Sequence, residues 1–235
     1  MTIAREGYPF AAAGVLLAGI CWAAIWLGVG TTEGVVAETT VVGTGGLVLR
    51  GLAWLLTGLS VFVLWFFRNP EPNVPDDAAL VVAPGQGKVI GISDVEETTF
   101  MGGPARRITI FLSVFDVHVQ RAPVSGAVAH KVYRPGAYAV AWAEKASEIN
   151  EQASLGISTD NGPVLVRQIA GLIARRIITD PAEGDTVERG RRFGLIRFGS
   201  RVDLFLPLHW EILCEVGDRV RVGSTVLARQ QGGNA

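Results

Sequence analysis

The chain has 235 residues, a formal net charge of −1 at pH 7 and 49% hydrophobic residues. Without a basic stripe, this charge balance excludes nucleic acid as a partner. Cys21 and Cys214 are too few for a disulfide framework or a zinc site, and the missing HExxH and His-x-His patterns exclude a zinc peptidase, so no metal is expected.

The first predicted element is an uncharged apolar run over residues 10–30. At a rise of 1.5 Å per residue, a helix of this length crosses about 30 Å of hydrocarbon, which predicts a transmembrane helix. A cleaved signal peptide is the alternative. It is disfavoured because the apolar region is too long and no small-x-small cleavage site follows it.

A second apolar run covers residues 51–67 and is short for a full span, which tilt or local thinning of the bilayer accommodates. Basic residues flank the two runs on the outside, at Arg5 and Arg68, whereas the connection over 31–50 is acidic in its early part. The positive-inside tendency then places both termini in the cytoplasm. Residues 1–68 are predicted to form a transmembrane helical hairpin in the cell's inner membrane.

Three prolines between residues 69 and 77 end the apolar region, so residues 69–79 are predicted to be a linker and 80–235 a second domain. That domain has short Val- and Ile-rich segments separated by Gly, Pro and Asp, which predicts a mainly β sandwich or barrel with few helices. The strand candidates are 106–113, 126–133, 154–159, 163–169 and 201–206, and 171–178 fits either helix or strand.

Two internal echoes refine the fold prediction. Gly-Asp-x-Val-x-x-Gly occurs at 184–190 and 217–223, and a looser Ala-Pro pattern occurs at 83–89 and 122–128. Such units resemble the interlocked hairpins of biotinyl and lipoyl carrier domains, so a barrel-sandwich-hybrid-like β domain is expected. A carrier function does not follow, because no lysine occupies an exposed hairpin tip.

Two places carry candidate chemistry. On an extended strand Asp116 and His118 would face the same side and could act as a pair, although a satisfied histidine beside a solvated carboxylate is the plainer interpretation. Ser200 follows Gly199 between two apolar runs, where a tight bend between strands is the plainer interpretation. The Gly-x-Ser-x-Gly pattern of serine hydrolases is absent around it.

Four segments in one order resemble the short-form phosphatidylserine decarboxylase proenzymes, and the resemblance covers essentially the whole chain. These segments are 115–126, Asn150-Glu151, 168–176 and 192–203.

The resemblance implies autocatalytic cleavage between Gly199 and Ser200, giving a β chain of residues 1–199 and an α chain of 200–235. In such enzymes the serine hydroxyl attacks the preceding carbonyl, the resulting ester undergoes elimination, and hydrolysis leaves a pyruvoyl group. That cofactor forms a Schiff base with the substrate amine and accepts the electrons that departing CO2 leaves behind. The implied reaction converts phosphatidylserine into phosphatidylethanolamine at the bilayer surface.

The resemblance also assigns roles to single residues. His118 is expected to be the acid that quenches the carbanion, and Arg121 to bind a carboxylate or phosphate of the substrate. One position departs from the family pattern: Gln86 stands where Asp is common, and its amide cannot act as a base. Asp116, acting through His118, is the candidate replacement for activation of Ser200.

Two alternatives stay open at this point. A non-enzymatic, membrane-anchored carrier or adaptor-like β domain would need Gly199 and Ser200 only as a turn. A decarboxylase of a related phosphoserine lipid, such as archaetidylserine, would present the same head group to the same site. The sequence also leaves open whether the chain forms a homo-oligomer.

Overall fold

A computed structural model describes residues 2–33, 40–137, 149–171, 176–197 and 200–231. The chain divides into two compact units, Met1–Asn69 and Pro70–Ala235. The boundary lies at the start of the proline-rich segment, where the ring of each proline removes a backbone donor and prevents helix continuation.

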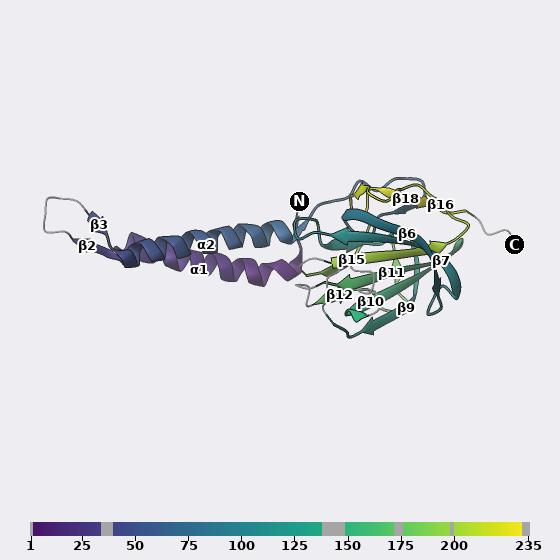
Figure 1. Ribbon diagram of the computed structural model, residues 1–235, viewed down its shortest axis with the longest axis horizontal. Coiled ribbons are helices and arrows are strands. Elements are labelled where there is room, and N and C mark those ends of the chain that lie inside the picture. Colours follow the sequence, from purple (N-terminus) through teal and green to yellow (C-terminus); the bar gives the residue numbers. More distant parts are fainter. Residues whose placement is uncertain (1, 34–39, 138–148, 172–175, 198–199, 232–235) are drawn as a thin grey trace. The chain divides into compact units, whose positions relative to one another are not determined.

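The first unit consists of two long apolar helices, α1 over Tyr8–Trp26 and α2 over Thr44–Phe66 (Figure 1). The 3-10 turn η1, Arg5–Gly7, precedes α1, and two short strand pairs accompany the helices: β1 (Thr2–Ile3) with β4 (Arg68–Asn69), and β2 (Thr31–Glu33) with β3 (Thr40–Val42). Both helices are long and apolar enough to cross a membrane.

The helix bounds differ from the expected 10–30 and 51–67. Helix α1 ends at Trp26 because Gly28 adopts φ 81°, and the N–H groups of Gly28 and Val29 close onto the carbonyls of Ile25 and Ala24. This is the glycine-terminated Schellman arrangement. Helix α2 already begins at Thr44, because a single Arg50 within an apolar segment does not interrupt helical hydrogen bonding.

The two helices run antiparallel and pack through small residues. A Cβ atom added to Gly14 would lie 2.5 Å from Ser60 Oγ, and Ala11, Ala18 and Ala53 are buried. Trp22 Nε1 donates a hydrogen bond of 3.2 Å to Thr57 Oγ1 on the other helix. Small side chains let the two backbones approach closely, as is typical of helix pairs in lipid.

The second unit is built from β strands, as the sequence predicted. Their bounds are β5 Leu80–Val82, β6 Gly87–Glu97, β7 Gly103–Leu112, β8 Val119–Arg121, β9 Gly126–Arg134, β10 Gln152–Thr159, β11 Gly162–Ala170, β12 Ile177–Thr179, β13 Thr186–Val187, β14 Arg192–Ile196, β15 Ser200–Pro207, β16 Glu211–Ile212, β17 Arg219–Val220 and β18 Val226–Arg229. All five strand candidates fall on strands, and the part of 171–178 that the structure describes includes the start of β12.

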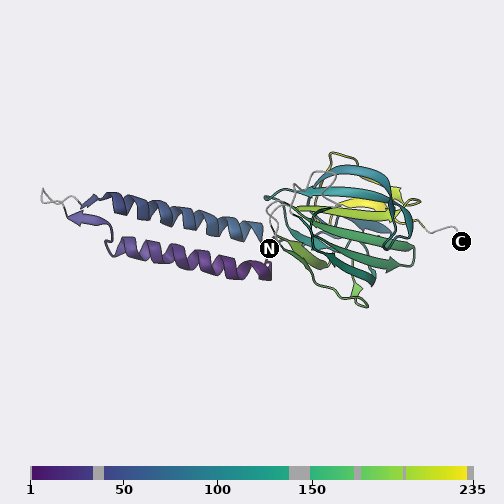
Figure 2. The same ribbon diagram turned by 60° about the horizontal axis from the view of Figure 1, so that its bottom comes forward.

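A curled antiparallel sheet runs through this unit (Figure 2). It has eight strands in the order β13-β9-β10-β11-β15-β7-β6-β17. Two sheets of three strands, β12-β14-β8 and β16-β18-β5, complete it. Alternate residues of the central strands form the main core, including Val166 of β11 and Val202, Leu204 and Leu206 of β15. A side chain's position in a strand therefore decides whether it faces this core or the opposite side of the sheet.

The strand order is symmetric about the central pair β11 and β15, so the unit contains two equivalent halves. Strands β8 to β14 form one half without interruption. The other half consists of β5 to β7 and β15 to β18, with the first half inserted after β7. Corresponding contacts relate the halves: Val82 N–H donates to the Pro123 carbonyl, and Arg121 N–H donates to the Pro84 carbonyl.

The repeated sequence segments contact each other within each half. In the first half, Val128 N–H donates to the Asp185 carbonyl and Gly184 N–H donates to the Val128 carbonyl. In the second half, Val89 N–H donates to the Asp218 carbonyl and Gly217 N–H donates to the Val89 carbonyl. Gly184 and Gly217 have φ of 91° and 110°, which glycine adopts without strain. Each Ala-Pro segment thus pairs with one Gly-Asp segment.

Candidate active site

The site lies where three neighbouring strands of the large sheet end together. Leu112 of β7, Ser200 of β15 and Ala170 of β11 are paired in one row. From this row the chain connects to the three-stranded sheet in the same order, to β8, β14 and β12. The three strand ends are therefore neighbours, and β15, which follows β14 in the chain, begins at the middle one.

Ser200 is the first residue of β15 and is completely buried. Its side chain shares the face of Val202 and Leu204, toward the main core. Its Oγ forms no hydrogen bond within the described residues. Leaving a buried hydroxyl unpaired costs about 1–3 kcal/mol, so the position calls for an explanation other than stability. Gly199, its partner across the predicted cleavage site, lies outside the described residues.

His118 lies at the end of the segment between β7 and β8, directly before β8, and is fully buried. Because Leu195 of β14 pairs with Val119, the strand that leads to Ser200 passes beside His118. The His118 Nδ1 atom is 2.9 Å from the Asp116 carbonyl oxygen. A carbonyl can only accept, so Nδ1 carries the hydrogen, and in the neutral ring the lone pair is on Nε2.

The segment around Asp116 is a turn and not the extended strand on which Asp116 and His118 would face the same side. Residues 114–116 form a turn, in which Asp116 Oδ2 accepts hydrogen bonds from Ser113 N (2.9 Å) and Ser113 Oγ (2.8 Å). Its Oδ1 accepts from Arg219 Nη1 at 3.1 Å. An aspartate readily closes such a turn on a nearby backbone N–H. Asp116 therefore contacts His118 through its main-chain carbonyl, while its carboxylate stabilises the turn.

Arg121 has its guanidinium on two backbone carbonyls. Nη1 donates to Gly190 O and Nη2 to Pro70 O, each at 2.9 Å, and the residue is 5% exposed. Burial lowers the pKa of this guanidinium, and Arg191 and Arg192 lower it further, whereas Glu71 opposes them. These contacts hold the first residue of the second unit against the turn that precedes β14.

Gln86 lies between Gly85 and Gly87, close to the same row of strand ends. A Cβ at Gly87 would lie 2.0 Å from the Phe111 carbonyl oxygen, and one at Gly85 would lie 3.5 Å from the side chains of Leu112 and Val202. The backbone approaches so closely that Gly87 cannot be replaced without a shift. Gln86, where the sequence departs from the expected Asp, therefore lies beside β7, the strand whose Leu112 pairs with Ser200.

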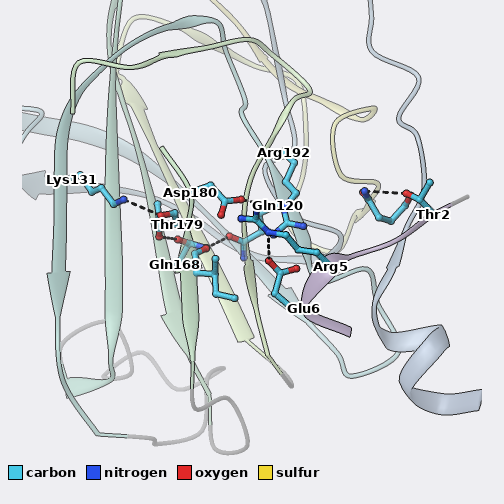
Figure 3. Close-up of polar contacts among 11 residues, drawn as sticks. Thr2, Arg5, Glu6, Gln120, Lys131, Gln168, Thr179, Asp180 and Arg192 are labelled. Atoms are coloured by element: carbon cyan, nitrogen blue, oxygen red, sulfur yellow. Dashed lines mark hydrogen bonds and ion pairs between the residues drawn. The ribbon is translucent and has the colours of Figure 1, made fainter. Parts of the chain in front are cut away.

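The sequence assigned no site role to three buried polar residues beside this row, Gln120, Asn150 and Gln168. Gln168 of β11 contacts Gln120 of β8 and Thr179 of β12, so that the two sheets are joined by side-chain hydrogen bonds (Figure 3). Asn150 Nδ2 donates to the Ala170 carbonyl at 2.8 Å, next to Ser200 in the row. In the sequence these residues appear only as members of the segments that carry the family resemblance, and no local pattern marks them as one cluster.

On the opposite face of β15, Arg201 and Asp203 form a buried ion pair. Nε and Nη2 of Arg201 lie 2.7 and 2.9 Å from the two carboxylate oxygens, and the residues are 3% and 0% exposed. Arg201 Nη2 also donates to Thr109 Oγ1 on β7. The hydrogen bond from Arg201 to Thr109 connects the strand that begins at Ser200 to β7.

Comparison with known proteins identifies the family. A family model for phosphatidylserine decarboxylase matches residues 59–228. The chain belongs to the phosphatidylserine decarboxylase family.

Relatives named phosphatidylserine decarboxylase proenzyme match most of the chain. The one from Symbiobacterium thermophilum is 46% identical over 97% of this chain and 95% of its own length. Those from Salinibacter ruber and Magnetococcus marinus are 51% and 38% identical, over 74% and 98% of this chain and 78% and 96% of their own lengths. Membership of the phosphatidylserine decarboxylase family confirms the resemblance and excludes the non-enzymatic alternative.

Proposed function

We propose that this chain is a self-processing carboxy-lyase that converts phosphatidylserine into phosphatidylethanolamine and CO2, with Ser200 as the precursor of a pyruvoyl group. The observation that supports the site is the buried Ser200 hydroxyl, which has no hydrogen-bond partner within the described residues. It begins β15 at the middle one of three neighbouring strand ends, and His118 lies in the segment that follows the neighbouring strand β7. A backbone bond between β14 and β15 can be cut without separating either strand from its sheet.

The residues around Ser200 fit the formation of that group. His118, with its hydrogen on Nδ1, can accept the Ser200 proton on Nε2. Asp116 would position the ring through its main-chain carbonyl, which replaces the side-chain activation expected from the sequence. A pyruvoyl group at residue 200 supplies an electron-accepting carbonyl for decarboxylation. His118, once protonated, can then return a proton to the substrate carbon.

The fold retains both products of cleavage. Residues 200–207 form backbone ladders with β7 on one side and β11 on the other. Arg201 of the α chain also donates to the Thr109 hydroxyl of the β chain, at 3.3 Å. The β chain of 1–199 and the α chain of 200–235 are therefore expected to stay associated.

The two apolar helices support attachment to the membrane in which the substrate resides. Spans of 22 and 23 residues, Arg5–Trp26 and Thr44–Phe66, match the thickness of a bilayer. With Arg5 and Arg68 at their outer flanks, the positive-inside rule favours a transmembrane hairpin in the inner membrane and a cytoplasmic catalytic unit. Arg121 as a ligand of the lipid head group stays a prediction, since its contacts also support a role in holding Pro70 in place.

The proposal is tested with purified protein in vesicles that contain phosphatidylserine. Wild-type protein should release CO2 and form phosphatidylethanolamine, and Ser200→Ala should abolish both. His118→Gln should lose decarboxylation by about 100-fold or more, as expected for loss of a general acid. Full activity of either variant would contradict the assignment of that residue. Vesicles with archaetidylserine test whether the related lipid is also a substrate.

A further inference from the structure

A chain of buried polar side chains connects the two sheets beside Ser200. Gln168 Nε2 donates to Gln120 Oε1 at 2.5 Å and to the Ile178 carbonyl at 3.3 Å, and Thr179 Oγ1 donates to Gln168 Oε1 at 2.5 Å. Both glutamines are 0% exposed. Figure 3 shows the sequence of contacts from Thr179 through Gln168 to Gln120.

These contacts determine which end of the Gln120 amide is engaged. The Ile178 carbonyl can only accept, so the nitrogen of Gln168 must face it, and the same nitrogen then meets the oxygen of Gln120. Gln120 Nε2 remains as a buried donor with no partner among the described residues. Two buried polar groups in this region, Gln120 Nε2 and Ser200 Oγ, thus have no partner within the described part of the chain.

The fold itself does not require these amides, because the equivalent positions in the other half are apolar. The matching registers of the two halves make Val81 of β5 equivalent to Gln120, Leu206 of β15 equivalent to Gln168, and Ile212 of β16 equivalent to Thr179. Val81 and Leu206 belong to the main apolar core, and Ile212 packs against it. The polar version occurs only in the half whose strands lead to Ser200.

The register also places the amides near the serine. Gln168 pairs with Val202, and Ala170, two residues further along β11, pairs with Ser200. Residues two apart on a strand share a face, and diagonal neighbours across a pair lie about 7–8 Å apart. An extended glutamine side chain covers most of that distance. Gln168 therefore holds Gln120 within the space between the two sheets that Ser200 also faces.

We propose that Gln120 is a catalytic hydrogen-bond donor for the self-processing step, with Gln168 as its positioning residue; this rests on the proposed cleavage before Ser200. As Ser200 Oγ bonds to the carbonyl carbon attached to its own nitrogen, its proton passes to His118 and the carbonyl electron pair moves onto oxygen. Gln120 Nε2–H donates to that oxyanion and transfers no proton. Collapse restores the carbonyl and breaks the C–N bond, and the Ser200 nitrogen takes up a proton.

The most direct test replaces the three polar residues by their apolar equivalents from the other half. The triple variant Gln120→Val, Gln168→Leu, Thr179→Ile, and the single variant Gln120→Val, are made as full-length chains in lipid nanodiscs. Processing is followed on denaturing gels as the conversion of one chain into two. We expect the triple variant to retain its melting temperature in a Ser200→Ala background and to process about 100- to 1,000-fold more slowly, as for loss of an oxyanion donor. Processing at the wild-type rate would overturn the proposal.

Two further variants separate catalysis from folding. Thr159→Val removes a side-chain hydrogen bond to the Gly162 carbonyl at the opposite end of β11, and should process near the wild-type rate. Gln120→Glu can donate only while its carboxyl group is protonated, so its processing should slow as pH rises through the pKa of that group. A Gln120→Glu rate that parallels wild type at every pH would refute a donor role, even if the valine variants fail to fold.

Failure of the proposed function has a different signature. If wild-type protein stays a single chain, or if Ser200→Ala is still cleaved, the cleavage site itself is wrong. If wild-type protein is cleaved before Ser200 and the Gln120 variants are cleaved equally fast, only the role of Gln120 is refuted.

Discussion

Replacing Asp203 with Asn should strongly destabilise the domain that carries Ser200. Asp203 is 0% exposed and binds Arg201 through both carboxylate oxygens. The amide has nearly the same shape but no charge, so the substitution leaves a buried guanidinium without the carboxylate opposite it. Arg201 Nη2 also donates to the neutral hydroxyl of Thr109 on β7, at 3.3 Å.

The expected magnitude follows from the burial of the pair. Breaking a buried ion pair by removing one partner costs about 3–5 kcal/mol. For a chain of this size each kcal/mol lowers the melting temperature by about 2–4 °C, so the decrease should be roughly 6–20 °C. Glu188 and Arg191 form an ion pair whose side chains are 72% and 75% exposed, and Glu188→Gln should cost less than about 1 kcal/mol.

The assay is thermal unfolding in detergent, in a Ser200→Ala background so that every sample is a single chain. Replacing both partners, as Arg201→Met with Asp203→Leu, should recover most of the loss, because two apolar side chains remove the uncompensated charge. A melting temperature of Asp203→Asn that equals that of Glu188→Gln would refute the argument that this buried pair stabilises the domain.

Three more predictions concern other parts of the molecule. Gly194→Ala places a Cβ 2.2 Å from the Ile178 carbonyl oxygen and 3.0 Å from Gln168 Nε2, so we expect it to lower the free energy of unfolding in urea by about 1–3 kcal/mol. The control Gly91→Ala, whose nearest contact would be 3.9 Å, should lower it far less. Equal losses would contradict this packing. Burial alone raises the pKa of Glu97, but hydrogen bonds from Thr99, Phe100 and Met101 and the charge of Arg167 outweigh it and lower the pKa below the ordinary 4.5. The contribution of ionised Glu97 to stability is therefore complete above pH 4.5 and is lost as pH falls through the lower folded-state pKa. Glu97→Gln should flatten the acid side of a plot of melting temperature against pH. An unchanged plot would contradict this role of Glu97. Gly14→Leu should lower the melting temperature of the helix pair because its Cβ meets Ser60 Oγ at 2.5 Å, while Gly19→Leu, with nothing within 4 Å, serves as the control that should not.

The strands could be predicted where the local pattern decides the outcome. The five strand candidates correspond to β7, β9, β10, β11 and β15, because alternating apolar residues bounded by turn residues reflect one buried face. The two apolar helices were also recognisable, although Arg50 concealed the start of α2. The end of α1 was not predicted either, because Gly28 lies within an apolar run.

The arrangement of the site could not be predicted from local patterns. Seven-residue echoes revealed a repeat, but most paired positions in the two halves share no residue type, as Gln168 and Leu206 illustrate. That one half is inserted into the other appears only in the strand pairing. The sequence left the segment around Asp116 open between strand and turn, and the carboxylate of Asp116 itself stabilises the turn. Gln120 was not assigned a role because its partner Gln168 comes from β11, far along the chain.

The central claim is that Ser200 becomes the cofactor by self-cleavage, and the masses of the denatured wild-type chains test it most directly. The account predicts a β chain that ends at Gly199 and an α chain of residues 200–235 whose first residue is a pyruvoyl group in place of serine. Ser200→Ala should give one chain of 235 residues. A single full-length chain in wild-type protein that decarboxylates phosphatidylserine would contradict the account.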